Sequence, residues 1–206
     1  MRIGFFMCFF YSLIVVNAQK TVHKLILADH VDVIQINTAN CFSVRIQTSK
    51  GKEVTVNAEI EGEYSKDLDL KMATNGNTLD VAAGFTPNFE NPNDKLSAHK
   101  VVSIALTISI PNWKKVDVYG TNSRVSVTGM YTELNVSLSD GDCNLTGVLG
   151  DIHAKTQSGT INLNAEQANI FATSKYGQVS SNPIPTGNSE FILESVTGNI
   201  QLSKTE

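Results

Sequence analysis

The eight residues QSGTINLN, at positions 157–164, place a glycine before alternating apolar and polar side chains, and this pattern recurs at a fixed interval. SDGDCNLT occupies positions 139–146, eighteen residues earlier, and KYGQVSSN occupies positions 175–182, eighteen residues later. Alternation at period two predicts a strand with one buried face. A fixed repeat of such strands predicts units that stack on one another.

Steps of eighteen residues align apolar positions throughout the second half of the chain. The aligned sets are Val116, Leu134, Ile152 and Ile170; Val118, Val136, Ala154 and Ala172; Val125, Cys143, Ile161 and Val179; Val127, Leu145, Leu163 and Ser181; and, at the corners, Ser123, Gly141, Gly159 and Gly177. A three-residue insertion within 183–187 shifts the last unit, and the pattern resumes over 191–202. Each unit holds two strands too short to bury themselves, so stacking must bury them. We therefore predict an all-β, single-domain β-solenoid, a parallel β-helix with turns of about 18 residues over 113–204. Parallel crossovers favour a right-handed coil.

The first half, residues 19–112, is rich in strands but lacks this regular spacing. Period-two patterns predict strands at 31–37, 42–48, 53–61, 69–74, 77–83 and 101–110. Asn75-Gly76 predicts a hairpin turn, because these residues accept the positive φ that such turns need. We expect this half to be wider, to contain antiparallel strands and to close one end of the solenoid. Residues 84–98 have no pattern and predict a long loop.

The first 18 residues have the composition of a secretory signal peptide. Met1-Arg2 is positively charged, residues 3–16 are largely apolar, and Val16-Asn17-Ala18 offers small residues for cleavage before Gln19. The apolar run is too short to span a bilayer comfortably, and nothing after residue 18 predicts a transmembrane span. We expect a processed domain of residues 19–206, exported to the periplasm, the cell surface or the medium.

Charge and cysteine content narrow the classes of partner. Without the first 18 residues, the chain has 15 basic and 20 acidic residues, a net charge of −5, which argues against nucleic-acid binding. Only Cys41 and Cys143 then remain, and a disulfide between them is open in an oxidising compartment. Because Cys143 aligns with apolar positions, we expect its side chain to point inward as a free thiol.

The order of features resembles the auto-transporter adhesin head family, also called the GIN domain, an exported family of unknown function. The resemblance covers residues 25–204 and depends on TISIP (107–111) leading to KKVDVYG (114–120), followed by SGTINL (158–163) and TGNIQL (197–202). It implies a β-helical fold and a location in the envelope or outside the cell. No membrane barrel, passenger linker or sorting tail follows the repeats, so the resemblance brings no anchoring machinery.

The outward positions of the repeat offer little chemistry. They are Asp117, Asn135, His153 and Phe171; Tyr119, Ser137, Lys155 and Thr173; Arg124, Asp142, Thr160 and Gln178; and Ser126, Asn144, Asn162 and Ser180. No acid–base pair stands at working distance, so we predict no catalytic residues, no cofactor and no enzyme activity. We interpret Asp140 and Asp142, and the group Asp29, His30 and Asp32 with nearby His23, as polar turns, and we predict no metal site.

One set of apolar and aromatic residues is a candidate interaction patch: Phe171, Ile192, Tyr119, His153, Phe85 and Phe89. Phe171 and Ile192 fall on an outward column that is otherwise polar, and such a patch is usually covered. Either the loop 84–98, which contains Phe85 and Phe89, covers the column, or these aromatic residues form a strip that contacts a glycan or a protein.

The sequence therefore predicts a non-catalytic, exported, adhesin-like surface-binding module. Its partner, an unknown protein or glycan at the cell envelope, is not identified, and a homo-oligomer remains open. The second hypothesis is a periplasmic envelope-stress or assembly accessory that acts by protein–protein contact. The third is a carbohydrate-active enzyme, which the β-helical architecture permits.

Overall fold

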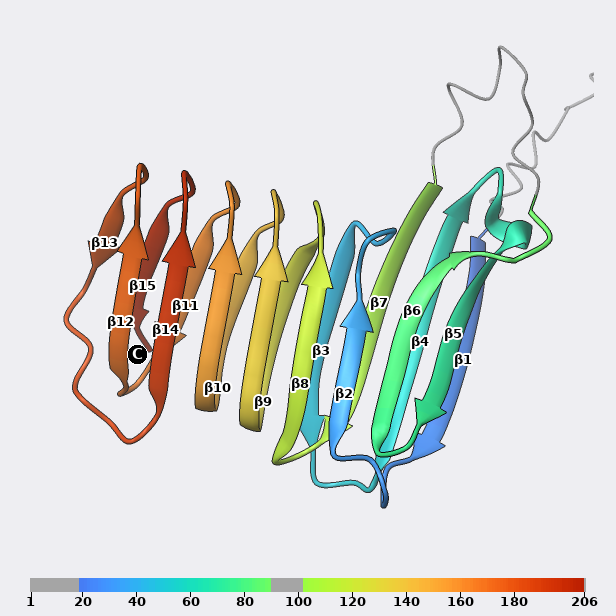
Figure 1. Ribbon diagram of the computed structural model, residues 1–206, viewed down its shortest axis with the longest axis horizontal. Coiled ribbons are helices and arrows are strands. Elements are labelled where there is room, and N and C mark those ends of the chain that lie inside the picture. Colours follow the sequence, from blue (N-terminus) through green and yellow to red (C-terminus); the bar gives the residue numbers. More distant parts are fainter. Residues whose placement is uncertain (1–18, 90–101, 206) are drawn as a thin grey trace, which may run out of the picture.

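The computed structural model describes residues 19–89 and 102–205, and its regular elements are fifteen strands and one short 3-10 turn, η1 (Ser65–Asp67) (Figure 1). The predicted signal peptide and most of the predicted loop 84–98 lie outside these residues. The all-β prediction is confirmed, and the strands coil into a solenoid-like stack with two faces. Within the described residues, no helix is long and apolar enough to cross a membrane.

The two faces are defined by the order in which their strands pair. The A face consists, in spatial order, of β1 (Gln19–Leu27), β4 (Glu53–Gly62), β7 (Val102–Pro111), β3 (Ser43–Ser49), the first part of β9 (Arg124–Leu138), the first part of β10 (Cys143–Thr156), β11 (Ile161–Ala165), β15 (Ile200–Lys204) and β13 (Val179–Ser181). The B face consists of β5 (Leu68–Asn75), β6 (Thr78–Phe85), β2 (Val33–Asn37), β8 (Lys114–Gly120), the second parts of β9 and β10, β14 (Glu190–Ser195) and β12 (Asn169–Ser174). Because β9 and β10 each bend from one face to the other, the pairing is continuous through all the strands.

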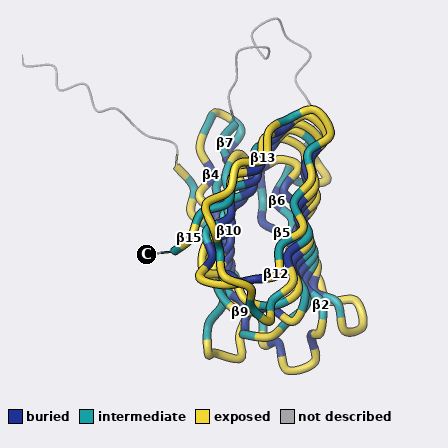
Figure 2. Tube along the Cα trace, turned by 90° about the vertical axis from the view of Figure 1, so that its left-hand side faces the viewer, coloured by how far each residue is buried: buried dark blue, intermediate teal, exposed yellow. Residues whose placement is uncertain are grey.

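The aligned apolar positions face the interior of this coil. Cys143 pairs with Val125 on one side and with Ile161 on the other, each eighteen residues away, and all three are fully buried. Viewed along the stack, buried residues line the inside of a flattened ring and exposed residues lie outside (Figure 2). The period-two pattern therefore correctly predicts which side chains form the core.

The rungs do not stack in the order of the sequence. Strand β14 pairs with both β10 and β12, and β15 pairs with both β11 and β13, so the last rung, 190–204, lies between two earlier rungs. Ile152 therefore contacts Phe191, and Ile170 follows on the far side of Phe191. The aligned sets predict the correct columns but the wrong neighbours beyond β10 and β11.

Glycines at the corner between the B and A faces follow the same order. A Cβ atom on Gly198 would lie 2.1 Å from the Gly159 carbonyl oxygen, and one on Gly177 would lie 2.2 Å from the Gly198 carbonyl oxygen. The backbones of successive rungs are thus too close here for any side chain. Glycine is required at this corner by close stacking, and not by a positive φ.

The N-terminal half contains antiparallel pairs, as predicted. Strand β4 pairs antiparallel with β1 and β7, and β5 pairs antiparallel with β6. The six predicted strands correspond to β2 through β7 with shifts of one or two residues at their ends. The hairpin turn lies one residue later than predicted, because Asn75 pairs with Thr78 and the turn residues are Gly76, at φ 61°, and Asn77.

Candidate functional site

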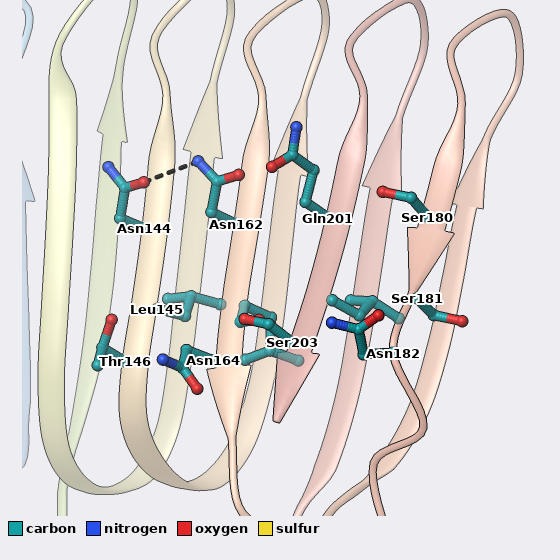
Figure 3. Close-up of a pocket in the computed structure, with 12 residues that line it drawn as sticks. Asn144, Leu145, Thr146, Asn162, Asn164, Ser180, Ser181, Asn182, Gln201 and Ser203 are labelled. Atoms are coloured by element: carbon teal, nitrogen blue, oxygen red, sulfur yellow. Dashed lines mark hydrogen bonds between the residues drawn. The ribbon is translucent and has the colours of Figure 1, made fainter. Parts of the chain in front are cut away.

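A polar groove crosses the outer A face near the C-terminal end of the stack. It has a volume of about 480 Å³ and is formed by β10, β11, β15 and β13 (Figure 3). Two rows of outward side chains cross these strands: Asn144, Asn162, Gln201 and Ser180 in one, and Thr146, Asn164, Ser203 and Asn182 in the other. The repeat predicts three members of the first row, and Gln201 joins them because β15 lies between β11 and β13.

The side chains of the groove are partly bonded to one another along the stack. Asn162 Nδ2 donates to Asn144 Oδ1 at 2.8 Å, and Ser203 Oγ donates to the Leu163 carbonyl oxygen at 3.2 Å. An amide in such a ladder offers one further donor or acceptor to the solvent side. None of the twelve residues that line the groove is charged. The groove therefore presents neutral donors and acceptors at the spacing of the strands.

The B face carries part of the predicted interaction patch. His153 pairs with Ile192 and Ile192 pairs with Phe171, so these three outward side chains form one row on β10, β14 and β12. His153 and Ile192 border a shallow hollow of about 250 Å³, and Phe171 is 56% exposed. Tyr119 projects from β8 in the neighbouring column and does not border this hollow.

Phe85 and Phe89 lie far from Phe171, so the structure does not bring the predicted patch together. Phe85 stacks on Phe89 with ring centroids 4.1 Å apart, and Tyr64 makes a T-shaped contact with each of these rings. This cluster is beside β6, six strands from β12 on the B face, or roughly 30 Å at the usual strand spacing. The described part of the loop 84–98 therefore does not cover Phe171, and its remainder lies outside the described residues.

An ion pair occupies the B face next to the column of Asp117, Asn135 and His153. Lys115 Nζ lies 2.9 Å from both carboxylate oxygens of Glu133, and Asn135 Nδ2 donates to Glu133 Oε1 at 2.8 Å. The hydrogen bond from Lys115 and, to a smaller extent, the one from Asn135 lower the pKa of Glu133. Glu133 is thus held ionised, which is the opposite of what a general acid needs.

The acidic residues that we interpret as turns make hydrogen bonds within the protein. Asp140 accepts from Ser158 Oγ at 2.6 Å, Asp142 accepts from the Thr160 amide at 3.0 Å, and Asp32 accepts from Asn77 Nδ2 at 2.9 Å. His23 Nδ1 lies 2.6 Å from Asn57 Oδ1. Within residues 19–89 and 102–205, no group of three or more His, Cys, Asp or Glu side chains is arranged to hold a metal ion.

The two cysteines of the described residues, Cys41 and Cys143, are buried free thiols. Burial raises the pKa of Cys41 to about 12, and burial together with the charge of Asp142 raises the pKa of Cys143 to about 12. The inward orientation predicted for Cys143 is confirmed. Thiols with such values are almost wholly protonated near neutral pH, so they are core residues and poor nucleophiles.

A row of exposed apolar side chains at the lower corner of the stack was not predicted. Trp113 is 58% exposed and has a φ of 62°, and its amide donates to the Met130 carbonyl oxygen at 3.0 Å. Met130 pairs with Leu149, and both side chains are exposed. Sequence reasoning missed this row because its members are corner residues at unequal intervals. The signal was the single tryptophan between two predicted strands.

The family follows from a match to residues 95–206, more than half of the chain, by the family model Toastrack DUF4097. The protein belongs to the Toastrack family. This match supports the predicted membership of a domain family of unknown function, whereas the resemblance to the auto-transporter adhesin head family remains a prediction. No curated protein matches this sequence.

The first of the solved structures compared with this Toastrack protein shares its fold. A proposed cell adhesion protein from Clostridium sporogenes superposes with a TM-score of 0.68 at 14% identity, over 91% of this chain and 100% of that one. A proposed adhesin from Parabacteroides merdae gives a TM-score of 0.47 at 13% identity, over 91% of this chain and 97% of that one, which is too low a score to support an argument. At such identities the first similarity establishes the fold alone. The solenoid-like fold is supported, and the right-handed sense of the coil remains a prediction.

Proposed function

We propose that this Toastrack protein is an exported, non-catalytic binding module that holds an uncharged glycan in the polar groove of the A face. The observation that carries the proposal is the double row of neutral amide and hydroxyl side chains on four adjacent strands (Figure 3). A sugar polymer offers hydroxyl groups that both donate and accept, and it needs no counter-charge. Export is supported by the signal peptide predicted over residues 1–18.

The repeat of the groove suits an extended ligand. Adjacent strands are about 4.8 Å apart, so a polymer lying along the stack meets an equivalent side chain at each strand. Each contact replaces a bond to water and contributes little alone, so affinity grows with the number of strands engaged. We therefore expect weak binding of single sugars and stronger binding of chains of several units.

Binding without cleavage is supported by the chemistry of the groove. Hydrolysis of a glycosidic bond uses a pair of carboxylic groups flanking the bond. The twelve residues of the groove include no carboxylate. On the B face, Glu133 is held ionised by Lys115.

The proposal is tested with residues 19–206 on an array of neutral and acidic glycans, with released reducing ends measured in the same samples. Asn162→Ala and Gln201→Ala should each weaken retention of neutral chains several-fold. Gln35→Ala is the matched control, since Gln35 projects from the B face, and it should bind normally. Retention that is unchanged by both groove variants, or measurable cleavage, would refute the proposal.

A second candidate is an envelope accessory that acts by protein contact, and the exposed row of His153, Ile192 and Phe171 favours it. An aromatic ring that is 56% exposed beside a second apolar residue is a common anchor of protein interfaces. Cross-linking in intact cells with Phe171→Ser as the comparison tests it. If Phe171→Ser removes a specific cross-linked protein while glycan retention persists, the B face is a protein-contact surface.

A further inference from the structure

The C-terminal end of the stack is built from two strands that carry no charge. Strand β12 reads NIFATS and β13 reads VSS, and within the described residues each pairs on one side only, with β14 and β15 respectively. A strand that pairs on one side leaves backbone donors and acceptors free for another strand. Proteins usually protect such edges with charged side chains, which are missing from these two strands.

The order of the rungs produces this neutral end. The last rung of the sequence contains Glu190, Glu194 and Lys204, and stacking in sequence order would leave it at the end, where its charges would protect the edges. The structure instead places this charged rung inside, between β10 and β12 and between β11 and β13. The rung whose two strands are uncharged is thereby moved to the end, and its one charged residue, Lys175, lies in the corner between them, with its Nζ 4.9 Å from the centre of the Tyr176 ring.

The opposite end of the stack is protected. Lys20 Nζ donates to the Leu68 carbonyl oxygen at 2.6 Å, and Lys24 Nζ donates to the Leu70 carbonyl oxygen. Strands β1 and β5 are the two edge strands of that end (Figure 1), and these two lysine side chains join them. The edge strands of this end are therefore covered by charged side chains, whereas β12 and β13 at the other end carry none.

The core is also open at the C-terminal end. Val179 belongs to the column of Ile161 and Ile200, which are fully buried, yet Val179 is 43% exposed. The segment 182–189 covers the lower part of this end, where the Pro185 carbonyl oxygen accepts from the Ala168 amide. The upper part, around Val179, is exposed to solvent.

The hydrogen-bond register identifies which groups a partner would meet. The Asn169 amide donates to the Ser189 carbonyl oxygen, so odd-numbered residues of β12 bond to β14. In a parallel pair the intervening residues point the other way, and the amides of Ile170 and Ala172 therefore face away from the stack. Ile170 lines a hollow together with Pro183 and Ile184 of the covering segment, so a strand laid along the upper part of β12 would bond to Ala172.

We propose that this end is an interface that pairs with the same end of a second copy of the chain. The two-fold axis that lies in the plane of the end and perpendicular to the strands sets β12 antiparallel to β12 of the second copy, so the pairing closes after two copies. Because neither strand is charged, the symmetry brings no like charges together. The exposed Val179 and the half-buried Ile170 and Ala172 then leave water.

Light scattering over a dilution series of residues 19–206 tests this inference, which does not depend on the groove. The expected mass is that of two copies, and Thr173→Lys on β12 should weaken association at least about tenfold by placing like charges near the two-fold axis. Thr128→Lys is the matched control, because Thr128 is an exposed threonine on β9, away from the end. Hydrogen exchange should also show the Ala172 amide protected in the dimer and exposed on dilution.

Three outcomes would overturn the inference. They are a single-copy mass at every concentration that light scattering reaches, equal weakening by Thr173→Lys and Thr128→Lys, or growth beyond two copies, which would require a head-to-tail contact. Circular dichroism of each variant separates loss of association from loss of folding.

Discussion

Replacement of Gly159 by alanine tests the close stacking at the corner of the rungs. A Cβ atom on Gly159 would lie 1.8 Å from the carbonyl oxygen and 2.5 Å from the carbonyl carbon of Gly141. Ordinary contacts begin near 3.4 Å, so the two backbones must separate by about 1.6 Å. Both neighbours are backbone atoms of a paired rung, so the strain cannot be relieved by rotating a side chain.

The cost follows from what this separation breaks. The Cys143 amide donates to the Thr160 carbonyl oxygen at 2.9 Å beside this corner, and an opening of that size removes the bond. A lost hydrogen bond costs about 1 kcal/mol and overpacking about 1–3 kcal/mol, so we expect Gly159→Ala to lower the free energy of unfolding by about 3 kcal/mol. The corresponding fall in melting temperature is about 6–12 °C.

Urea unfolding of residues 19–206, followed by circular dichroism, measures this difference. Gly51→Ala is the matched control, because its nearest neighbour would be Ser49 Oγ at an ordinary 3.5 Å, and it should change stability by less than about 0.5 kcal/mol. If Gly159→Ala is as stable as the control, the backbones at this corner are not in contact, and the argument for glycine there is wrong.

Three further predictions concern the thiols, the rung order and an ion pair. Both native cysteines should resist a maleimide in the folded protein and react in urea; rapid labelling without urea would contradict their burial. In a cysteine-free background, His153→Cys with Ile192→Cys should form a disulfide on mild oxidation. His153→Cys with Phe171→Cys should not, because these positions are two strand spacings, or about 9.6 Å, apart. The reverse result would show that the rungs stack in the order of the sequence. Lys115 lowers the pKa of Glu133, so the stability this pair provides is present above the ordinary carboxyl value of 4.5 and is lost as pH falls through the lowered value. Glu133→Gln should reduce the loss of stability on acidification, measured as the fall in melting temperature from pH 7 to pH 3. An equal fall in the variant and the wild type would show that the pair contributes nothing to stability.

The core of the repeat was predictable because burial follows a strict alternation. Val125, Cys143 and Ile161 share a column in the sequence and in the structure, since a slip of one residue would turn each side chain to the other face. Six of the seven described strands before residue 112 were found for the same reason, and β1 (Gln19–Leu27) was missed. The column of corner glycines could also be recognised in the sequence. The structure shows that glycine is needed there because the rungs stack closely, and not because of an unusual φ.

The order of the rungs was not predictable, because alternation specifies which face is buried but not which neighbour lies beside it. Ile152 has an apolar partner whether Ile170 or Phe191 follows it, so both orders satisfy the pattern. The place of Gln201 in the groove depends on that order and was missed for the same reason. The separation of Phe85 from Phe171 follows from the length of the stack, which the sequence of one loop does not reveal.

The position of the last rung also determines when the protein can finish folding. A chain emerging from a ribosome or a membrane channel releases residues 169–181 before 190–204. Because β12 and β13 pair only with strands of the later segment, the interior stays incomplete until residues 190–204 are free. A premature stop before Glu190 would therefore remove an inner layer of the stack, and not its outermost one. Quality control that senses exposed core would thus detect the loss of the C-terminus as an internal defect.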